Sequence, residues 1–280
     1  MPGAVKSPRR RGDAVPLLLA IARSVLSRPT HHTYAHEHAV QVADLHLPRG
    51  VGPFPVAVLL HGGHWQARHG KLTTRPLAVD LTHRGWAAWN VEYRRLGKGQ
   101  GGGWPATFSD VATAIDHLAA LGDARLDLAR VVVIGHSAGG QLALWAAARR
   151  GLLGAAPGAS PRVRVGAVVA LAPVTELARA GRAARALLGG YPEQVPERFA
   201  QADPIQRLPL GLPTLLVHAS DDPTIDVRDS RAYVRAARAA GDDATLVEPA
   251  TGAHRGLLDP GTKTWKTAAE WLGGLPVLRP

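Results

Sequence analysis

The chain has 280 residues, of which 46% are hydrophobic and 20% are charged, and its formal net charge is +11. This composition suits a folded globular protein and argues against disorder over most of the length. The absence of cysteine excludes disulfides, thiolate nucleophiles and cysteine-ligated metals, and no apolar run reaches the roughly 20 residues that span a bilayer.

The positive charge does not by itself predict a nucleic-acid partner, because phosphate binding needs clustered basic residues. Here they are scattered, and only Arg9-Arg10-Arg11 forms a dense run. We therefore expect a small-molecule partner and no nucleic acid, with at most a weak attraction for anionic substrates or surfaces. The sequence leaves the oligomeric state open.

Residues 1–33 are interpreted as an N-terminal lead that is partly disordered or signal-like. The basic run precedes a short apolar stretch from Ala14 to Ala22, as in a secretory signal peptide. That stretch is barely long enough and contains Pro16, so a surface helix explains it equally well. We expect a cytoplasmic protein, with secretion as the alternative. The lead also carries histidines that we interpret as solvated rather than metal-bound: His31, His32, His36 and His38.

Residues 34–280 are expected to form one α/β domain, because short apolar runs alternate with helical patterns as in a doubly wound, mostly parallel sheet. The strands are predicted at 40–47, as an edge strand, and at 55–60, 86–93, 130–134, 163–171, 213–217 and 244–247. The helices are predicted at 75–84, 110–121, 138–150, 230–240 and 264–272. Between the strands predicted at 163–171 and 213–217, a helical piece at 176–188 and a proline-rich stretch predict a short cap-like insertion at about 176–212.

The strongest chemical signal is Gly135-His136-Ser137-Ala138-Gly139, which lies between a buried apolar strand and a helical stretch. A nucleophile elbow needs glycine two residues before and after the serine, because strand and helix approach closely there. The turn exposes the serine hydroxyl at the end of the strand, beside a helix N-terminus. We therefore predict Ser137 as the nucleophile.

An acyl-transfer serine also needs hydrogen-bond donors for the developing oxyanion. The loop His61-Gly62-Gly63-His64-Trp65 follows an earlier strand and can turn backbone N–H groups toward the site. We assign the amides of Gly63, His64 and Ala138 to this role, with Gly62 as the alternative on the loop. His61 and His64 could suggest a metal pair, but no carboxylate accompanies them at ligand spacing, so neither a metal nor a cofactor is expected.

The base and its orienting acid should follow the serine in the order acid, then histidine. His254 is the only histidine after His218, so it is the predicted base. Asp221, Asp222 and Asp226 share the loop that follows an earlier strand. We choose Asp222, because the proline after it shapes the turn, whereas Asp221 can cap or face solvent and Asp226 suits the start of a helix.

Substrate-pocket candidates are Trp65 and Trp104, which lie on loops near predicted strand ends, and His136 beside the nucleophile. The remaining tryptophans fit core or helix-packing positions.

These motifs resemble those of the arylformamidase-like and carboxylesterase-like branch of the α/β hydrolases, which carries a His-Gly-Gly-x-Trp oxyanion motif. The resemblance rests on His61 to Trp65, Gly135 to Gly140, His218 to Pro223 and Gly252 to His254. It implies the α/β-hydrolase fold and a triad of Ser137, Asp222 and His254. The chain departs from the pattern at two places, since His218-Ala219 and Thr224-Ile225 stand where similar proteins often have His-Gly and Val-Pro.

The expected function is that of a serine hydrolase that cleaves carboxylic esters or small amides, including formamides such as N-formylkynurenine, through an acyl-enzyme on Ser137. A peptidase or acyl-aminoacyl hydrolase is the alternative among enzymes, because the same triad cleaves peptides. The alternative of another class is a non-catalytic protein that keeps the fold as a ligand-binding shell.

Overall fold

The structure is a computed structural model, and it describes residues 14–24 and 26–275. The Arg9-Arg10-Arg11 run lies outside these residues, as does the start of the lead. The apolar stretch from residue 14 onward forms helix α1 (Ala14–Ser24). In the part of the chain that is described, no helix combines the length and the apolar character needed to cross a membrane.

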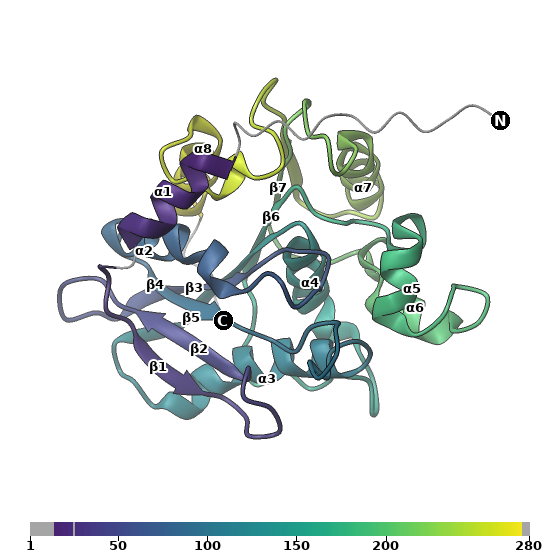
Figure 1. Cartoon of the computed structure of the whole chain (residues 1–280), viewed down its shortest axis with the longest axis horizontal. Coiled ribbons are helices and arrows are strands. Elements are labelled where there is room, and N and C mark those ends of the chain that lie inside the picture. The colour runs from purple at the N-terminus through teal and green to yellow at the C-terminus, as the bar shows by residue number, and fades with distance from the viewer. Residues whose placement is uncertain (1–13, 25, 276–280) are drawn as a thin grey trace.

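An eight-stranded sheet forms the centre of the molecule (Figure 1). The strands are β1 (Thr30–Thr33), β2 (Val42–His46), β3 (Phe54–Leu60), β4 (Ala87–Val91), β5 (Leu126–His136), β6 (Ala167–Leu171), β7 (Thr214–Val217) and β8 (Ala244–Val247). Their order across the sheet is β1-β2-β4-β3-β5-β6-β7-β8. The strands from β4 to β8 in this order are parallel, whereas β1 and β2 run antiparallel to their neighbours. The mostly parallel sheet that the sequence predicts is therefore present.

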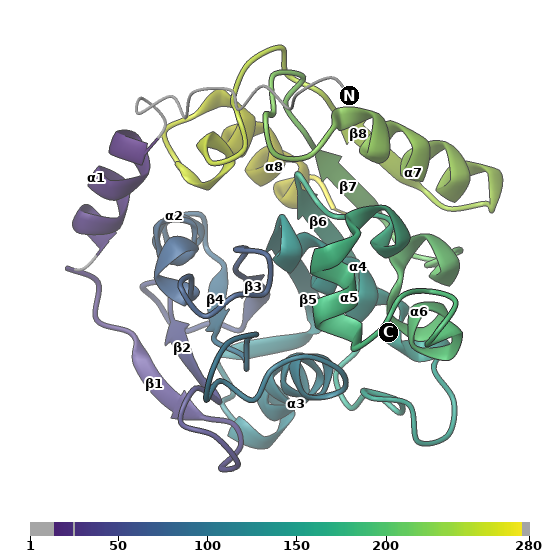
Figure 2. The same ribbon diagram turned by 45° about the vertical axis from the view of Figure 1, so that its right-hand side comes forward.

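Helices cover both faces of the sheet, as Figure 2 shows. They are α2 (Arg75–His83), α3 (Ala106–Leu121), α4 (Ala138–Ala147), α5 (Arg182–Leu188), α6 (Pro196–Ala202), α7 (Val227–Ala239) and α8 (Lys263–Gly273). Successive side chains of a strand point to opposite faces, so β3 supplies Val56 and Val58 to the core under α3, α4 and α7. It supplies Ala57 and Leu59 to the second core, under α1, α2 and α8. Each core is a cluster of buried hydrophobic side chains, and together they hold the sheet between the two layers of helices.

One prediction about the first strands was wrong. The strand predicted at 40–47 is not an edge strand, because β1 pairs with it through Thr30 to Thr33. His31 and His32 belong to β1, where His31 Nδ1 lies 2.5 Å from Asp44 Oδ1 and the His31 side chain is still 73% exposed. Four polar residues carry no hydrophobic alternation, so only the neighbouring strand reveals this pairing.

The segment between β6 and β7 forms the predicted cap-like insertion. It contains α5, α6 and two short 3-10 helices, Leu177–Ala180 and Pro204–Arg207. The stretch that we predicted as proline-rich and irregular therefore includes a helix, which begins with Pro196 at its first turn. The insertion packs on the helix after Ser137, because Gln141 Nε2 donates to the carbonyl of Ala202 at 2.9 Å.

Candidate active site

Ser137 occupies the turn between β5 and α4, where the chain reverses direction at the carboxyl end of the central strand. Its backbone has φ 55° and ψ −117°, a conformation that residues other than glycine rarely adopt. The turn is held from below, because Ser137 N donates to Leu171 O at 2.8 Å. A strained backbone of this kind persists only where the surrounding structure imposes it. The packing around Ser137 therefore holds this residue in an unfavourable backbone conformation.

The flanking glycines are required by close contact between backbones. A Cβ on Gly135 would lie 2.0 Å from the carbonyl oxygen of Gly139, and a Cβ on Gly139 would lie 2.1 Å from that of Leu60. No side chain tolerates such distances. The glycine spacing that the sequence shows is thus explained by β5, α4 and the end of β3 meeting around Ser137.

His254 and Asp222 come together from two loops at the same edge of the sheet. His254 Nδ1 lies 2.7 Å from Asp222 Oδ2. The carboxylate accepts, so Nδ1 carries the proton and Nε2 is left as an acceptor. Among the residues that the structure describes, no hydrogen bond joins Ser137 Oγ to His254, and catalytic hydrogen bonds of this type often form only with substrate in place.

The Asp222 side chain is fully buried and surrounded by donors. Its Oδ1 accepts from Thr224 N at 2.7 Å and from Ile225 N at 3.1 Å. Burial raises the pKa of Asp222, but the hydrogen bonds from His218 and His254 outweigh it and hold the pKa well below that of an ordinary aspartate. Asp222 is therefore ionised beside His254 at neutral pH.

His218 is a contact of Asp222 that the sequence reasoning missed. It is fully buried, and its Nε2 lies 3.3 Å from Asp222 Oδ2. The same nitrogen lies 3.1 Å from the carbonyl of Ile225, while Nδ1 lies 2.8 Å from Ser230 Oγ. Two acceptors at Nε2 require that nitrogen to donate, so Ser230 donates to Nδ1. The only signal in the sequence is that His218 begins the motif His218 to Pro223 at the end of a predicted strand, and we assigned it no role there.

The two other aspartates of this loop have different partners. Asp221 Oδ1 accepts from Ala253 N at 2.8 Å and ties the acid loop to the residue before His254. Asp226 caps α7 and accepts from Arg228 N at 2.9 Å, as the sequence predicts for a helix start. Only Asp222 contacts the imidazole.

The loop of residues 61–66 packs directly against the turn at Ser137, and we call it the oxyanion loop after the role that the sequence predicts for it. A Cβ on Gly62 would lie 2.7 Å from His136 O and 3.1 Å from Ser137 Cβ, so the loop backbone touches the elbow at this residue. Gly63, His64 and Trp65 then follow with φ values of 116°, 54° and 57°. This run of left-handed residues turns the loop sharply beside Ser137. Opposite it, Ala138 begins α4, where N–H groups have no partner within the helix.

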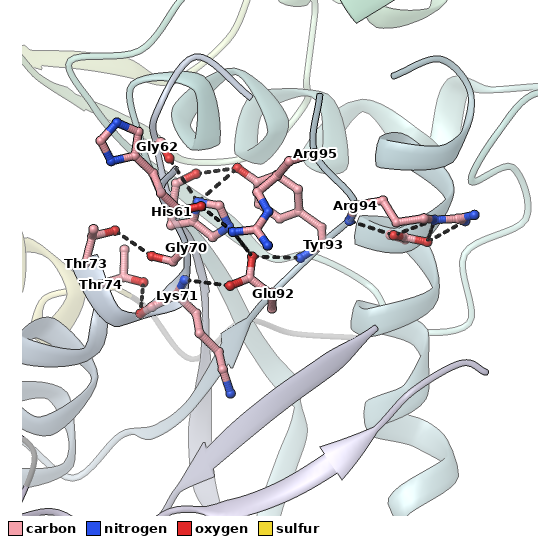
Figure 3. A network of polar contacts seen from close by, with 12 residues as sticks. His61, Gly62, Gly70, Lys71, Thr73, Thr74, Glu92, Tyr93, Arg94 and Arg95 are labelled. Atoms are coloured by element: carbon pink, nitrogen blue, oxygen red, sulfur yellow. Dashed lines mark hydrogen bonds and ion pairs between the residues drawn. The ribbon is translucent and has the colours of Figure 1, made fainter. Parts of the chain in front are cut away.

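A buried polar network supports the oxyanion loop (Figure 3). His61 Nε2 lies 2.7 Å from Glu92 Oε1, and His61 Nδ1 lies 2.9 Å from the carbonyl of Gly62. The Tyr93 hydroxyl donates to His61 O at 2.6 Å, and the two rings stack at 4.2 Å between centroids. Burial opposes ionisation of Glu92, but His61 and Arg95 overcome it and lower the pKa of this carboxyl. Nothing in the sequence links Glu92 to this loop, because Glu92 directly follows another strand, β4.

His136 is buried next to Ser137, and its ring lies against His254. The two ring centroids are 4.6 Å apart, and His136 Nε2 donates to the carbonyl of His254 at 2.8 Å. Burial, followed by the charge of His254, lowers the pKa of His136 to about 3. The ring therefore stays neutral and anchors the His254 loop to the elbow. We predicted His136 as a pocket residue. In the structure its ring contacts the loop that carries His254.

The two tryptophans proposed for the pocket lie in different surroundings. Trp65 is 1% exposed, packs in the core and donates from Nε1 to Gln141 Oε1 at 3.2 Å. This interior position differs from the pocket wall that we predicted, because the left-handed turn directs the side chain inward. Trp104 is half-buried, contacts Phe108 and donates from its backbone N to Leu187 O at 2.7 Å, at the base of the cap.

Within residues 14–24 and 26–275, no group of three or more His, Asp or Glu side chains could hold a metal ion. Glu92 is a carboxylate that lies close to His61 in space but not in the sequence, and it pairs with His61 and with Arg95. The network in Figure 3 is thus a support for the loop.

Comparison with known proteins places this geometry in context. The model of the BD-FAE family matches residues 43–236, which is more than half of the chain. This range includes Ser137 and Asp222 and ends before His254. Esterase LipC of Mycobacterium tuberculosis is 31% identical over 237 residues, which cover 77% of this chain and 56% of that protein. The chain thus spans little more than half the length of this curated relative.

Solved structures share the fold. A truncated carbohydrate esterase from gut microbiota superposes with a TM-score of 0.76 at 21% identity, and the match covers 88% of this chain and 96% of that one. Native esterase Est2 of the planctomycete Thermogutta terrifontis superposes with a TM-score of 0.73 at 24% identity, over 90% and 94% of the two chains. The fold is therefore the α/β-hydrolase fold that the sequence motifs imply.

Proposed function

We propose that this chain, which belongs to the BD-FAE family, is a serine hydrolase that cleaves carboxylic esters through an acyl-enzyme on Ser137. The observation that carries the proposal is the 2.7 Å contact between His254 Nδ1 and Asp222 Oδ2 beside a strained serine turn. An imidazole held in this tautomer can take a proton at Nε2, which a neutral serine needs before it can attack.

The steps follow from these groups. His254 Nε2 accepts the Ser137 proton as Oγ attacks the ester carbonyl, and Asp222 stabilises the imidazolium that forms. His254 then protonates the leaving alcohol, and water releases the acid by the reverse sequence. The buried, ionised state of Asp222 supports this role, because a neutral aspartic acid would not stabilise the cation.

The oxyanion that forms in each step needs donors in a fixed position. The Ala138 N–H at the start of α4 is one candidate, and its place at a helix N-terminus favours negative charge. The oxyanion loop supplies the second, through the amide of Gly63 or His64. Contact between Gly62 and the elbow supports this choice, because it brings the loop backbone beside Ser137.

A substrate panel tests the proposal and its scope. Purified wild-type protein and the Ser137→Ala variant are assayed with short, long and aryl esters and with N-formylkynurenine. Both proteins are also treated with a fluorophosphonate probe. We expect labelling and ester turnover that both disappear in the variant. Turnover of N-formylkynurenine would extend the activity to formamides. A folded wild-type chain that neither labels nor turns over any ester would overturn the proposal.

A further inference from the structure

A pocket of about 560 Å³ lies beside the oxyanion loop, on the side of the sheet edge formed by β1 and β2. We call it the basic pocket, because its lining includes the cationic residues Arg68, Lys71, Arg75 and Arg95 together with His31 and His69. Its size lies within the roughly 300–1,000 Å³ typical of small-molecule sites. Neither the proposed triad nor the oxyanion donors line it, so the proposed mechanism leaves it unused.

One wall of the basic pocket is in contact with the oxyanion loop. A Cβ on Gly63 would lie 2.5 Å from Cβ of His69, so the His69 side chain packs on the backbone of Gly63. Burial lowers the pKa of His69, and the charges of Arg255 and Arg68 lower it further. Arg255 directly follows His254. The contact between His69 and Gly63 therefore joins the basic pocket to the oxyanion loop.

The basic pocket carries more positive than negative charge. Four cationic side chains line it, against the two carboxylates Asp44 and Glu92. Both carboxylates already have partners. Lys71 Nζ and His31 contact Asp44, and in Figure 3 the Lys71 side chain extends away from Glu92. Glu92 is held by His61 and by Arg95. Lys71 and Arg95 thus each face a carboxylate of the lining.

Arg68 is the exposed member of this set, and its guanidinium has no carboxylate partner among the described residues. Its Nε donates to His69 Nε2 at 3.2 Å, which orients the guanidinium. A guanidinium presents paired N–H donors that fit a carboxylate. An oriented arginine without a carboxylate partner among the described residues, in a pocket whose His69 packs on the oxyanion loop, is suited to hold a negative charge on a molecule bound at that loop.

We propose that the basic pocket is a subsite for a carboxylate carried by the ester substrate, with Arg68 as the residue that recognises it. The inference rests on the proposed function and narrows it, because it predicts that anionic esters are the preferred substrates. The scattered basic residues of the sequence thus contribute locally, through a few side chains gathered at one site.

The first experiment compares two matched acetate esters, 4-acetoxybenzoate and 4-acetoxybenzamide, which differ in the charge of one substituent. The ratio of their kcat/KM values is measured for wild type, Arg68→Gln and Arg235→Gln. Arg235 is an exposed arginine of α7, beside the opposite edge of the sheet, so its variant matches the loss of charge. Because every protein is tested with the same two esters, the difference in their intrinsic reactivity cancels when the ratios of different proteins are compared.

We expect Arg68→Gln to lower the ratio about fivefold or more, as for loss of one charge-assisted hydrogen bond, and Arg235→Gln to leave it unchanged. Equal ratios in all three proteins would overturn the subsite while leaving ester hydrolysis intact. A ratio that falls equally in both variants would assign the effect to net charge and would overturn it too.

A second measurement does not depend on turnover. Binding of 4-acetoxybenzoate to Ser137→Ala is followed by calorimetry, with and without the additional change Arg68→Gln. The subsite predicts weaker binding in the double variant, and the amide analogue should bind both proteins equally. If wild type neither labels with the fluorophosphonate nor hydrolyses any ester of the panel, but binding still depends on Arg68, the proposed function fails and the carboxylate site stands. Binding that is independent of Arg68 overturns the subsite.

Discussion

His218 Nε2 lies 3.3 Å from Asp222 Oδ2, the same oxygen that His254 contacts at 2.7 Å. The side chains of His218 and Asp222 are both fully buried. Because Nε2 also faces the carbonyl oxygen of Ile225, a second acceptor, His218 presents a donor to Asp222. This arrangement fixes which lone pairs of the carboxylate face His254, so His218 is a positioning residue for the proposed acid.

We predict that His218→Gln lowers kcat for a short-chain ester about 10- to 100-fold, as expected when a hydrogen bond to a charged group is lost. KM should change little, because His218 does not touch the substrate. Steady-state kinetics and a pH–rate profile on folded protein test this. Exposed His83 provides the matched control, His83→Gln, which should behave as wild type. Unchanged kcat in folded His218→Gln protein would contradict the positioning role.

The two adjacent aspartates should respond very differently to loss of charge. Asp222→Asn should reduce kcat about a thousandfold or more, because the amide cannot hold the required tautomer of His254 or stabilise its cation. Asp221→Asn keeps an oxygen that can accept from Ala253 N, so its effect should be smaller than about fivefold. Kinetics of both variants with one chromogenic ester settle the assignment, and the reverse ranking would move the acid to Asp221.

The elbow glycines predict a stability effect. Gly139→Ala should destabilise the protein by at least about 2 kcal/mol or prevent folding, because the new Cβ would lie 2.1 Å from Leu60 O. Gly273→Ala at the end of α8 is the control, since a Cβ there meets nothing within 4 Å. Chemical denaturation compares the two. Equal free energies of unfolding would show that strand and helix do not approach as closely as described.

The network in Figure 3 predicts that Glu92→Gln lowers kcat about tenfold while KM stays nearly constant. The amide oxygen can still accept from His61 Nε2, but the charge that pairs with Arg95 is lost and the oxyanion loop is held less firmly. Steady-state kinetics and a melting temperature are measured together. The exposed Glu270 of α8 provides the control for loss of a carboxylate, as the variant Glu270→Gln. A fall in melting temperature with unchanged kcat would make Glu92 purely structural.

His46 predicts a dependence of stability on pH. Burial is the main cause that lowers its folded-state pKa from 6.5 to about 4, while Asp44 opposes the shift. Between these values the unfolded chain binds the proton and the folded chain does not, so the free energy of unfolding falls as pH falls. The contribution lost by pH 4 is at most about 3 kcal/mol.

Urea denaturation at several pH values between 7 and 4 tests this expectation. The slope of stability against pH should be shallower for His46→Gln than for wild type. Exposed His36 serves as the control, and His36→Gln should keep the wild-type slope. Parallel slopes for all three proteins would exclude His46 as a cause of acid sensitivity.

The sequence by itself determined the features that depend on neighbouring residues. The strand, glycine, serine and helix of the elbow are contiguous, so their pattern predicts both the turn and Ser137. The alternation of strands and helices predicts the parallel sheet, and the carboxyl ends of parallel strands meet at one edge. That is why the loops carrying Asp222 and His254 could be assigned to one site before their 2.7 Å contact was seen.

The tertiary structure decided everything that joins distant segments without a periodic signal. His61 finds Glu92 at a separation of 31 residues, and His136 finds the His254 carbonyl at a separation of 118. Polar pairings of this kind leave no pattern in the sequence, because burial and direction exist only once the sheet has formed. The inward turn of Trp65, the role of His218 and the gathering of scattered arginines into the basic pocket depend on the same condition.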